Sequence, residues 1–326
     1  MNSFRTEFTP APSPHKIELS SPILTLGSCF ADTMGQRLSD YKFKASVNPF
    51  GVIFNPVSVA QLLTRVISQR LPREEHYLQS EGLWRHFDLH SDFAHPSLIE
   101  LEKAIQTTWA ETYTRLQEAQ WLLITLGTAT VYTYQLTDAV VANCHKVPAQ
   151  QFTKDRLPLG TIQESLSEAF ELLWELNPQL QIVLTVSPIR HLRDTLPVNS
   201  VSKATLRLAA QELAEHFPKQ VQYFPAYELV MDDLRDYRFY TEDMLHLTPV
   251  AQDYIWEKFT GAFLSKEALA FLPQWASIRR ALEHRPRNPS GEAHQVFLRS
   301  TLNRLAQWDG KVETDTERLL LESQLV

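Results

Sequence analysis

The sequence predicts an α/β fold in which a central parallel sheet is connected by crossover helices. Four short β-type runs recur along the chain, at residues 23–26, 121–126, 182–186 and 221–224. Each run is separated from the next by at least one segment with helical periodicity, as expected for parallel strands joined through helices. The chain has 326 residues, enough to bury a core without a metal or a disulfide.

The first run leads into a turn that contains Ser28. Beyond this turn, Ala31, Met34, Gly35 and Leu38 follow the i, i+3, i+4, i+7 spacing of one helical face. Ser28 is therefore predicted between a strand and a helix. In open parallel sheets, ligands bind at the carboxyl ends of the strands, toward which helix N-termini point their free N–H groups.

The same spacing predicts three further helices with one face in the core. One follows Asn55-Pro56, one precedes Asn177-Pro178 and one precedes the last strand. Their buried faces are expected to consist of Val59, Leu62, Leu63, Val66 and Ile67, of Ile162, Leu166, Ala169, Phe170 and Leu173, and of Leu206, Ala209, Ala210, Leu213 and Phe217. Residues 52–120 are interpreted as a long, largely helical insertion whose middle part has no assignable pattern.

The end of the domain is indicated by Thr248-Pro249, an N-cap followed by proline at the first helical position. A helix is expected from there to about residue 264, which leaves His246 on the loop at its entrance. From residue 265 on, helices are predicted on both sides of a turn cluster at 285–291. The prediction is thus a domain at 1–264, with the insertion at about 52–120, and a helical C-terminal appendage at 265–326.

Composition narrows the possible partners. The formal charge of −7 and the pI near 5.9 provide no general electrostatic attraction for nucleic acid or anionic membranes. Residues 1–21 lack the apolar run of a secretory signal, and no stretch is long enough to span a bilayer. The two cysteines, Cys29 and Cys144, are expected to be unpaired in a reducing compartment. We therefore expect a cytoplasmic protein, while the oligomeric state stays open.

Ser28, Asp243 and His246 are the candidate catalytic residues. A serine hydroxyl becomes a nucleophile when an imidazole takes its proton and a carboxylate orients that imidazole. Asp243 and His246 offer such a pair, and the chain order Ser, Asp, His is a known one. Each feature also has an ordinary explanation, since serine often caps a helix and Asp-x-x-His can occur in any exposed loop. Their joint occurrence at the ends of the first and last strands favours a site.

Five motifs give the chain a family resemblance: Gly27-Ser28-Cys29-Phe30-Ala31, Asn48-Pro49-Phe50-Gly51, Asn55-Pro56, Asn143-Cys144-His145-Lys146 and Ser187-Pro188-Ile189-Arg190-His191. The chain resembles the GSCFA family, which is named after the first of them. That family looks like a relative of the SGNH (GDSL-type) hydrolases. The resemblance implies a flavodoxin-like, three-layer α/β/α fold and ester or acetyl-ester chemistry on lipids and glycans.

SGNH enzymes share four sequence blocks, and the resemblance assigns three of them. Ser28 matches the nucleophile of the first block, Gly51 the oxyanion glycine of the second, and Asp243 with His246 the Asp-x-x-His of the last. The N–H groups of Ser28 and Gly51 are then expected to bind the oxyanion.

Two blocks depart from the SGNH pattern. The third reads Gly127-Thr128-Ala129 in place of Gly-x-Asn, and Gly27 stands where those enzymes have the Asp of Gly-Asp-Ser. Loss of one oxyanion donor costs roughly a hundredfold to a thousandfold in turnover. Four side chains are candidates to replace the missing Asn: Thr128, Asn48, Asn143 and His145.

Cysteine beside histidine, at Cys144-His145, suggests a thiol nucleophile or metal ligands. Adjacent side chains of a strand point to opposite faces, and a metal needs more ligands than this cluster offers. We interpret Asn143 and His145 as substrate-facing polar groups beside a buried thiol, and expect no metal. Cys29 is interpreted as a small residue packed under the Ser28 turn, with a pKa that the helix N-terminus could lower.

Several other polar residues have two interpretations. Arg190, His191 and Lys203 follow the third run and either grip an anionic substrate group or form solvated surface. Trp84, His86, Asp88 and His90 mix aromatic and polar character as a sugar-binding lid would. His284 and His294 are expected to cap or pack the appendage.

The sequence therefore predicts a serine esterase or acyltransferase that needs no cofactor. Its expected substrate is a small-molecule or glycan ester, such as an acetylated carbohydrate or a cell-envelope glycan precursor. The alternative is a weak or inactive SGNH-like domain that binds a glycan or a nucleotide-linked ligand.

Overall fold

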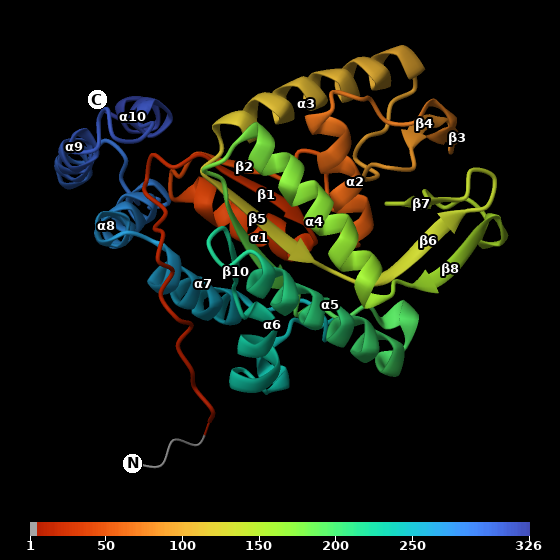
Figure 1. The fold of residues 1–326 in the computed structure, drawn as a ribbon. Helices are drawn as coiled ribbons and strands as arrows, with labels where there is room; N and C mark the ends of the chain where they lie inside the picture. Colours follow the sequence, from red (N-terminus) through yellow and green to blue (C-terminus); the bar gives the residue numbers. More distant parts are fainter. Residues whose placement is uncertain (1–4) are drawn as a thin grey trace.

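A five-stranded parallel sheet forms the centre of the protein in the computed structural model, which describes residues 5–326 (Figure 1). Its strands are β1 (Ile23–Gly27), β2 (Ala45–Val47), β5 (Trp121–Leu126), β9 (Gln181–Val186) and β10 (Val221–Tyr223). The spatial order is β10-β9-β5-β1-β2, and every pairing is parallel. This is the order of flavodoxin-like sheets, whose ligands bind where the order reverses, here between β1 and β5.

Helices cover both faces of the sheet. One face packs against α1 (Cys29–Asp40), α6 (Ala226–Glu228) and α7 (Pro249–Phe263), and the other against α2 (Pro56–Ile67), α3 (Leu98–Glu118), α4 (Leu159–Leu176) and α5 (Leu196–His216). Consecutive strand residues alternate between the two cores, so Ile23 faces α1 and α7 while Leu24 faces α2 to α5. The predicted three-layer α/β/α fold is confirmed.

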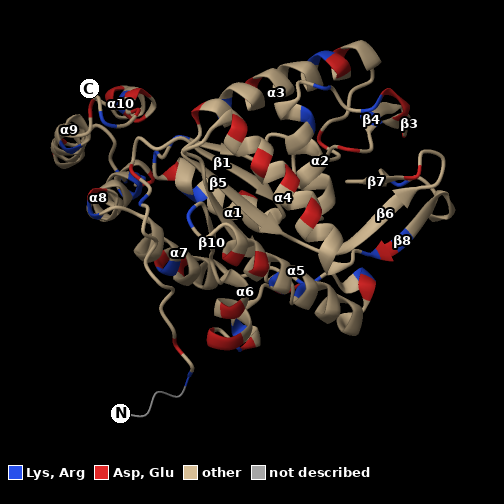
Figure 2. Cartoon of the chain, viewed as in Figure 1, with Lys and Arg blue, Asp and Glu red and all other residues tan. Residues whose placement is uncertain are grey.

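The helices begin where the capping signals predict. Asn55 caps α2, accepting a hydrogen bond from the Ser58 N–H at 2.8 Å, and Thr248 caps α7 with Pro249 at the first helical position. The outward face of α4 is acidic, with Glu164, Glu168, Glu171 and Glu175 exposed to solvent (Figure 2). Its inward face consists of the predicted apolar residues.

Residues 52–156 contain more β-structure than the sequence indicated. After η1 (Glu74–His76), β3 (Tyr77–Ser80) and β4 (Leu83–His86) form an antiparallel hairpin. A second antiparallel sheet consists of β6 (Thr130–Tyr134), β7 (Ala139–Val141) and β8 (Phe152–Arg156), preceded by η2 (Ala149–Gln151). Residues 74–95 and 130–156 together are called the side lobe below, because Phe87, Val141 and Phe152 give them a common apolar cluster.

The C-terminal helices lie at the opposite end of the molecule from the side lobe (Figure 1). They are α8 (Lys266–Leu282), α9 (Glu292–Ala306) and α10 (Asp315–Glu322), and they share an apolar cluster of their own. Trp275 joins them to the first helix, since its indole N–H donates to the Asp40 carbonyl at 2.9 Å. The domain division at residue 265 stays a prediction, and residues 1–4 of the first range lie outside the described residues.

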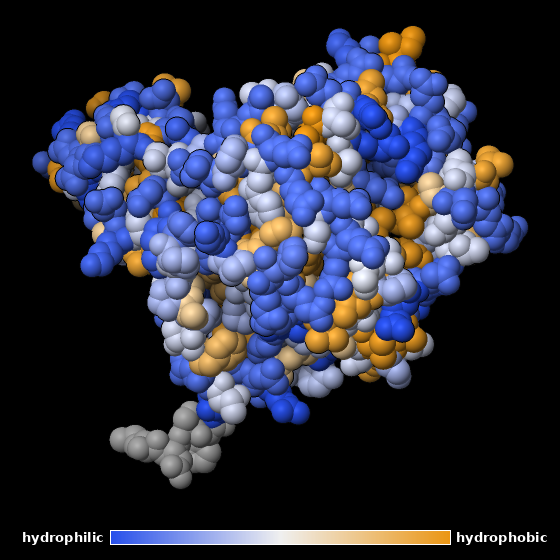
Figure 3. All heavy atoms as spheres, in the orientation of Figure 1, coloured by the Kyte–Doolittle hydropathy of each residue, from blue (hydrophilic) through white to orange (hydrophobic). Residues whose placement is uncertain are grey.

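An exposed apolar patch lies at the beginning of α5. Leu192, Leu196, Val198 and Val201 are exposed at η3 (Leu192–Asp194) and the beginning of α5, where hydrophobic residues gather in Figure 3. Within residues 5–326, every helix is too short or too polar to cross a bilayer.

Candidate active site

Ser28 lies at the turn between β1 and α1, as predicted. It is the N-cap of α1, and its Oγ accepts the Phe30 N–H at 3.4 Å. Its own N–H donates to the Thr125 carbonyl of the neighbouring strand at 3.1 Å. Only 2% of the residue is exposed. The hydroxyl is therefore held at the carboxyl edge of the sheet, next to the first N–H groups of a helix.

Gly27 has a structural reason for lacking a side chain. Its φ is +128°, and a Cβ at this position would lie 2.1 Å from the Thr125 carbonyl oxygen. The aspartate of the Gly-Asp-Ser pattern could not occupy this backbone without moving β5. The departure in the first block thus follows from how closely β1 and β5 approach one another.

Asp243 and His246 form a hydrogen-bonded pair inside one loop. His246 Nδ1 lies 2.5 Å from Asp243 Oδ2. The other carboxylate oxygen accepts the N–H groups of Leu245 and His246, both at 2.9 Å, and the Thr241 hydroxyl at 2.7 Å. These bonds, the His246 ring bond first among them, hold the pKa of Asp243 well below its usual range. The carboxylate orients the imidazole and leaves Nε2 on the far side of the ring.

The loop itself is closed by backbone bonds. The Thr241 N–H donates to the His246 carbonyl at 2.8 Å, and Tyr240 pairs with Leu247 in an isolated bridge. Met244 has a φ of +59°, a left-handed conformation that allows the chain to turn between the two members of the pair. The orientation of His246 therefore depends on a closed loop as well as on Asp243.

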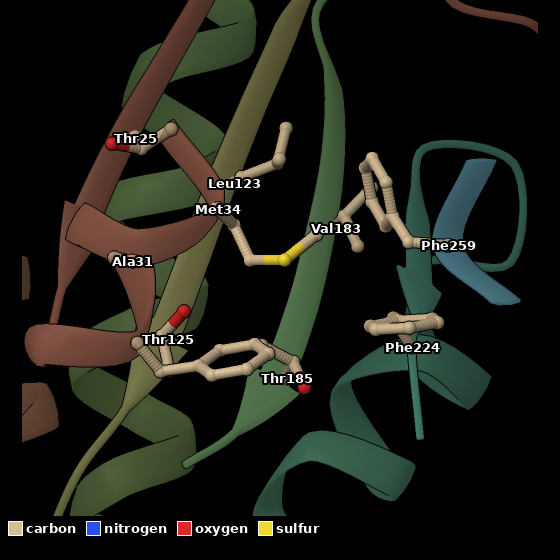
Figure 4. Close-up of a pocket in the computed structure, with 10 residues that line it drawn as sticks. Thr25, Ala31, Met34, Leu123, Thr125, Val183, Thr185, Phe224 and Phe259 are labelled. Carbon is tan, nitrogen blue, oxygen red and sulfur yellow. The ribbon is translucent and has the colours of Figure 1, made fainter. Parts of the chain in front are cut away.

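Helices α1 and α7 bring Ser28 and this loop to the same edge of the sheet. Arg37 of α1 and Asp253 of α7 form an ion pair at 2.5 Å. Met34 of α1 and Phe259 of α7 point into one small cavity beneath the edge (Figure 4). α1 directly follows β1, and α7 follows the segment after β10. Their N-caps, Ser28 and Thr248, therefore lie toward the same edge of the parallel sheet.

Ser28 and His246 are not hydrogen-bonded to each other in the described part of the chain. The Asp243–His246 pair is formed, whereas the contact of His246 with the Ser28 hydroxyl is not. Catalytic hydrogen bonds are often long in ligand-free enzymes and tighten when substrate binds.

The cavity beneath the edge is small and apolar. Its volume is about 20 Å³, room for about one water molecule. Thr125 and Thr185 from neighbouring strands line it (Figure 4), and the Thr185 hydroxyl has no hydrogen-bond partner among the described residues. It is too small to hold an acyl chain.

The two expected oxyanion donors already have acceptors. The Gly51 N–H donates to the Asn48 carbonyl at 2.7 Å, and the Ser28 N–H is bonded to Thr125. The Cys29 N–H, at the first position of α1, has no acceptor inside the helix and no oxygen acceptor among the described residues. An oxyanion would thus have to share the first two N–H groups or use the third.

The third block, Gly127-Thr128-Ala129, is held by hydrogen bonds within the protein. The N–H groups of Gly127 and Thr128 both donate to the Phe54 carbonyl, at 2.8 and 3.0 Å. The Thr128 hydroxyl is bonded to the Ser202 hydroxyl at 3.1 Å and accepts the Thr130 N–H at 3.0 Å. Thr128 is one of the four candidates to replace the missing Asn, and its hydroxyl is therefore already occupied by contacts within the protein.

Lys203 is buried, so the sequence-based interpretation of it as solvated surface charge was wrong. Only 1% of it is exposed, and its Nζ donates to the carbonyls of Gly127 at 2.6 Å and Ser187 at 2.7 Å. Burial lowers the pKa of this amine to about 7. Lys203 therefore links the residues that directly follow β5 and β9.

Arg190 and His191 lie at the same edge. The Arg190 guanidinium is 5.0 Å from the Tyr240 ring, so it contacts the loop that contains His246. The His191 ring meets the Phe54 ring at 5.3 Å, edge to face. Burial, with Lys203 nearby, lowers the pKa of His191 to about 4. Arg190 follows β9 as predicted, and a role in gripping an anionic substrate group stays a prediction.

Asn143 and His145 lie in the side lobe. The prediction that Cys144 and His145 sit on a strand is wrong, because His145 and Lys146 both have positive φ and the segment is a turn. Asn143 Oδ1 accepts the His145 N–H at 2.9 Å, and His145 Nε2 lies 2.8 Å from the His86 carbonyl. These polar groups hold the lobe together.

The lobe also buries most of the segment interpreted as a sugar-binding lid. His86 and Asp88 are buried, and Asp88 Oδ1 lies 2.7 Å from His76 Nδ1, a contact that the sequence did not indicate. His90 alone reaches the sheet edge, where its N–H donates to the Phe50 carbonyl at 3.2 Å. Across residues 5–326, no group of three or more His, Cys, Asp or Glu side chains is arranged to hold a metal.

Both cysteines are free thiols and half-buried. Burial and the neighbouring Asp32 raise the pKa of Cys29, opposite to the lowering expected from the helix N-terminus. Desolvation is the largest of these effects, and the hydrogen bond from the Cys29 backbone N–H lowers the pKa only in part. Burial also raises the pKa of Cys144, to about 11.

Comparison with known proteins identifies two family matches. The GSCFA family matches residues 22–259, and the C-terminal domain of GSCFA domain proteins matches residues 275–326. No curated protein matches the chain.

Three solved structures are similar at low identity. One, from Streptococcus pneumonia and described as a platelet activating factor, is 12% identical, with 74% of this chain and 83% of that chain covered and a TM-score of 0.38. A family 3 carbohydrate esterase of Clostridium thermocellum is also 12% identical, with 74% and 94% covered and a TM-score of 0.32. A family 2 carbohydrate esterase of Corynascus thermopiles (Myceliophthora fergusii), with its carbohydrate-binding domain, is 11% identical, with 82% and 69% covered and a TM-score of 0.36.

Proposed function

The chain belongs to the GSCFA family, and from its site geometry we propose that it is a serine esterase or acyltransferase acting through Ser28, His246 and Asp243. The observation that supports this most is the 2.5 Å hydrogen bond between Asp243 and His246, in a loop at the edge where Ser28 caps α1. A carboxylate-oriented imidazole and a serine hydroxyl at a helix N-terminus are the groups that acyl transfer requires, and the proposal holds that they meet when substrate binds.

In the proposed reaction, Ser28 Oγ attacks the ester carbonyl while His246 Nε2 takes the hydroxyl proton. Asp243 stabilises the imidazolium that forms. Collapse of the tetrahedral intermediate breaks the bond to the alcohol oxygen, which leaves with the proton from His246. Water, or an acceptor hydroxyl, then gives its proton to His246 and attacks the acyl-serine. The bond between the acyl carbon and Ser28 Oγ breaks, Oγ takes the proton back from His246, and the acid or the new ester leaves.

The oxyanion needs donors near Ser28. The Cys29 N–H at the start of α1 has no oxygen acceptor among the described residues, and the positive end of the helix dipole favours negative charge there. The Ser28 and Gly51 N–H groups can add to it only by sharing their present acceptors. We therefore expect turnover to be slow compared with enzymes that also have the third-block Asn.

The substrate class proposed is an ester of a hydroxylated molecule, such as an acetylated carbohydrate or a glycan precursor. Hydrolysis of p-nitrophenyl acetate tests the chemistry directly. Wild type should release p-nitrophenol, and Ser28→Ala should reduce kcat by about a thousandfold or more. Ser167→Ala, on the surface of α4, is the control that should leave the rate unchanged.

A second candidate is a binding protein on the same scaffold. The occupied N–H groups of Ser28 and Gly51, together with the occupied Thr128 hydroxyl, favour it because they leave few donors for an oxyanion. Equal rates for wild type and Ser28→Ala, at the level of buffer alone, would support this candidate over the esterase.

A further inference from the structure

An acidic and polar cluster lies on the β2 side of Ser28 and has no role in the acyl transfer described above. Asp32 is one helical turn along α1 from Ser28, so the two side chains share a face of the helix. Asn48 follows β2, and its Nδ2 donates to Asp32 Oδ1 at 2.5 Å. The pair therefore joins the first helix to the second sequence block.

His90 brings the side lobe to this cluster. It packs directly on Gly51, where a Cβ would lie 2.2 Å from the His90 Cβ. Its Nδ1 is 3.0 Å from Asp92 Oδ2, which fixes the ring, and the His90 side chain is about a quarter exposed. The Gly51 N–H donates to the Asn48 carbonyl at 2.7 Å and the His90 N–H to the Phe50 carbonyl at 3.2 Å, so His90 lies against the loop that begins with Asn48. Gly51 without a side chain is what allows the lobe to approach this closely.

The side chain of Asn48 has a buried oxygen without a hydrogen-bond donor, which indicates independently that a ligand or water binds here. The residue is only 7% exposed, and among the described residues its Oδ1 has no hydrogen-bond donor. A buried amide oxygen without a donor costs about 1–3 kcal/mol, so such atoms are rare unless a ligand or water completes them. Because the Nδ2 of the same amide is bonded to Asp32, the unpaired oxygen lies beside that carboxylate.

We propose that Asp32, Asn48 and His90 form a subsite that binds the hydroxyl groups of the alcohol part of the substrate, a neutral polyol such as a sugar ring. The subsite offers carboxylate and amide oxygens as acceptors and an imidazole nitrogen as a further partner, a set that pairs with neighbouring hydroxyls. The carboxylates of Asp32 and Asp92 disfavour phosphate or other anionic groups at this position. This inference rests on the proposed function for the statement that the bound sugar is the leaving alcohol.

Two esters separate this subsite from the catalytic groups. Methyl 6-O-acetyl-α-D-glucopyranoside has a sugar as its alcohol, and p-nitrophenyl acetate does not. Asp32→Asn and His90→Gln should each raise KM for the sugar ester about tenfold, the loss of one hydrogen bond to a charged or buried group, with little change in kcat. Neither variant should change kcat/KM for p-nitrophenyl acetate by more than about twofold. Asp155→Asn and His216→Gln, at exposed positions, are the matched controls.

A binding measurement tests the subsite without turnover. In the Ser28→Ala background, saturation-transfer NMR with methyl glucopyranoside, galactopyranoside and xylopyranoside should detect binding of at least one. Asp32→Asn should abolish the signal, and glucose 6-phosphate should not compete through its phosphate. Sugar binding without esterase activity would overturn the proposed function and keep the subsite. Esterase activity with no sugar binding, or equal losses on both esters, would overturn the subsite alone.

Discussion

His246 Nδ1 lies 2.5 Å from the carboxylate of Asp243, and both residues belong to a loop that its own backbone closes. The pair is therefore formed before any substrate is present. Its position before α7 and that of Ser28 before α1 place both at one edge of the sheet, because the two helices lie side by side.

Replacing Asp243 tests whether this pair is catalytic. Asp243→Asn should lower kcat for p-nitrophenyl acetate by about a hundredfold to ten thousandfold, because an amide stabilises neither the imidazolium nor the required tautomer. Glu242→Gln, an exposed neighbour in the same loop, should have no effect. Circular dichroism of both variants should match wild type, and unchanged kcat in Asp243→Asn would remove the pair from the mechanism.

A side chain at Gly27 should disrupt the approach of β1 and β5. Gly27→Ala combines a φ of +128° with a Cβ placed 2.1 Å from the Thr125 oxygen, so it should lower the free energy of unfolding by about 3 kcal/mol. Gly261→Ala is the matched substitution, because a Cβ there meets nothing within 4 Å inside α7. It should stabilise by about 0.5–1 kcal/mol. Urea unfolding measures both, and equal effects would contradict the account.

Acid should destabilise the side lobe through buried neutral histidines. His86 Nε2 donates to the Arg73 carbonyl at 2.9 Å, and its Nδ1 accepts the Asp88 N–H at 3.1 Å, so a proton on Nδ1 has no acceptor. Burial lowers the pKa of His86, and separately that of His145, to about 4. The unfolded state binds their protons at higher pH than the folded state does, so this stability is complete above about pH 6.5 and is lost toward pH 4.

The measurement is the free energy of unfolding between pH 7.5 and 4.5. Each such histidine should contribute a slope of up to about 1.4 kcal/mol per pH unit inside that window. His86→Gln, which cannot be protonated, should remove the contribution of His86 to this slope. A slope that is the same in His86→Gln and wild type would show that His86 is not buried as a neutral ring.

Lys203 should make the free energy of unfolding rise with pH above about pH 7. Its folded pKa of about 7 lies below the usual value of about 10.4, so above pH 7 the unfolded state holds a proton that the folded state has released. Stability should therefore rise from pH 7 to about 8.5, by up to about 1.4 kcal/mol per unit. Lys203→Met should lose this rise, and the exposed Lys219→Met should keep it. A wild-type curve that is flat or falls over this range would contradict the burial of the amine in the structure.

Local patterns were sufficient to predict most of the central layer. The four predicted strand runs, the α1 stripe and the caps at Asn55 and Thr248 all follow from neighbouring residues, and each is found where expected. β2 escaped prediction because none of its three residues is fully buried, whereas the equally short β10 has Val221 in the core. The strands of the side lobe escaped because they pack on one another, so their side chains lack the pattern of a central strand.

In the candidate site, too, local sequence was sufficient for some residues and not for others. Ser28, Asp243 and His246 could be selected from sequence because each is defined by its neighbours and by the start of a helix. The burial of Lys203 and the approach of His90 to Gly51 depend on contacts between distant segments. No local pattern encodes such contacts, so only the folded structure reveals them.

The most direct test of the central claim is labelling with a fluorophosphonate, followed by peptide mapping of the adduct. Wild type should be modified at Ser28, and His246→Ala should be modified at least about a hundredfold more slowly because the hydroxyl has lost its base. Absence of an adduct on Ser28 in folded wild type, or equal labelling rates in wild type and His246→Ala, would contradict the claim that these two residues act together.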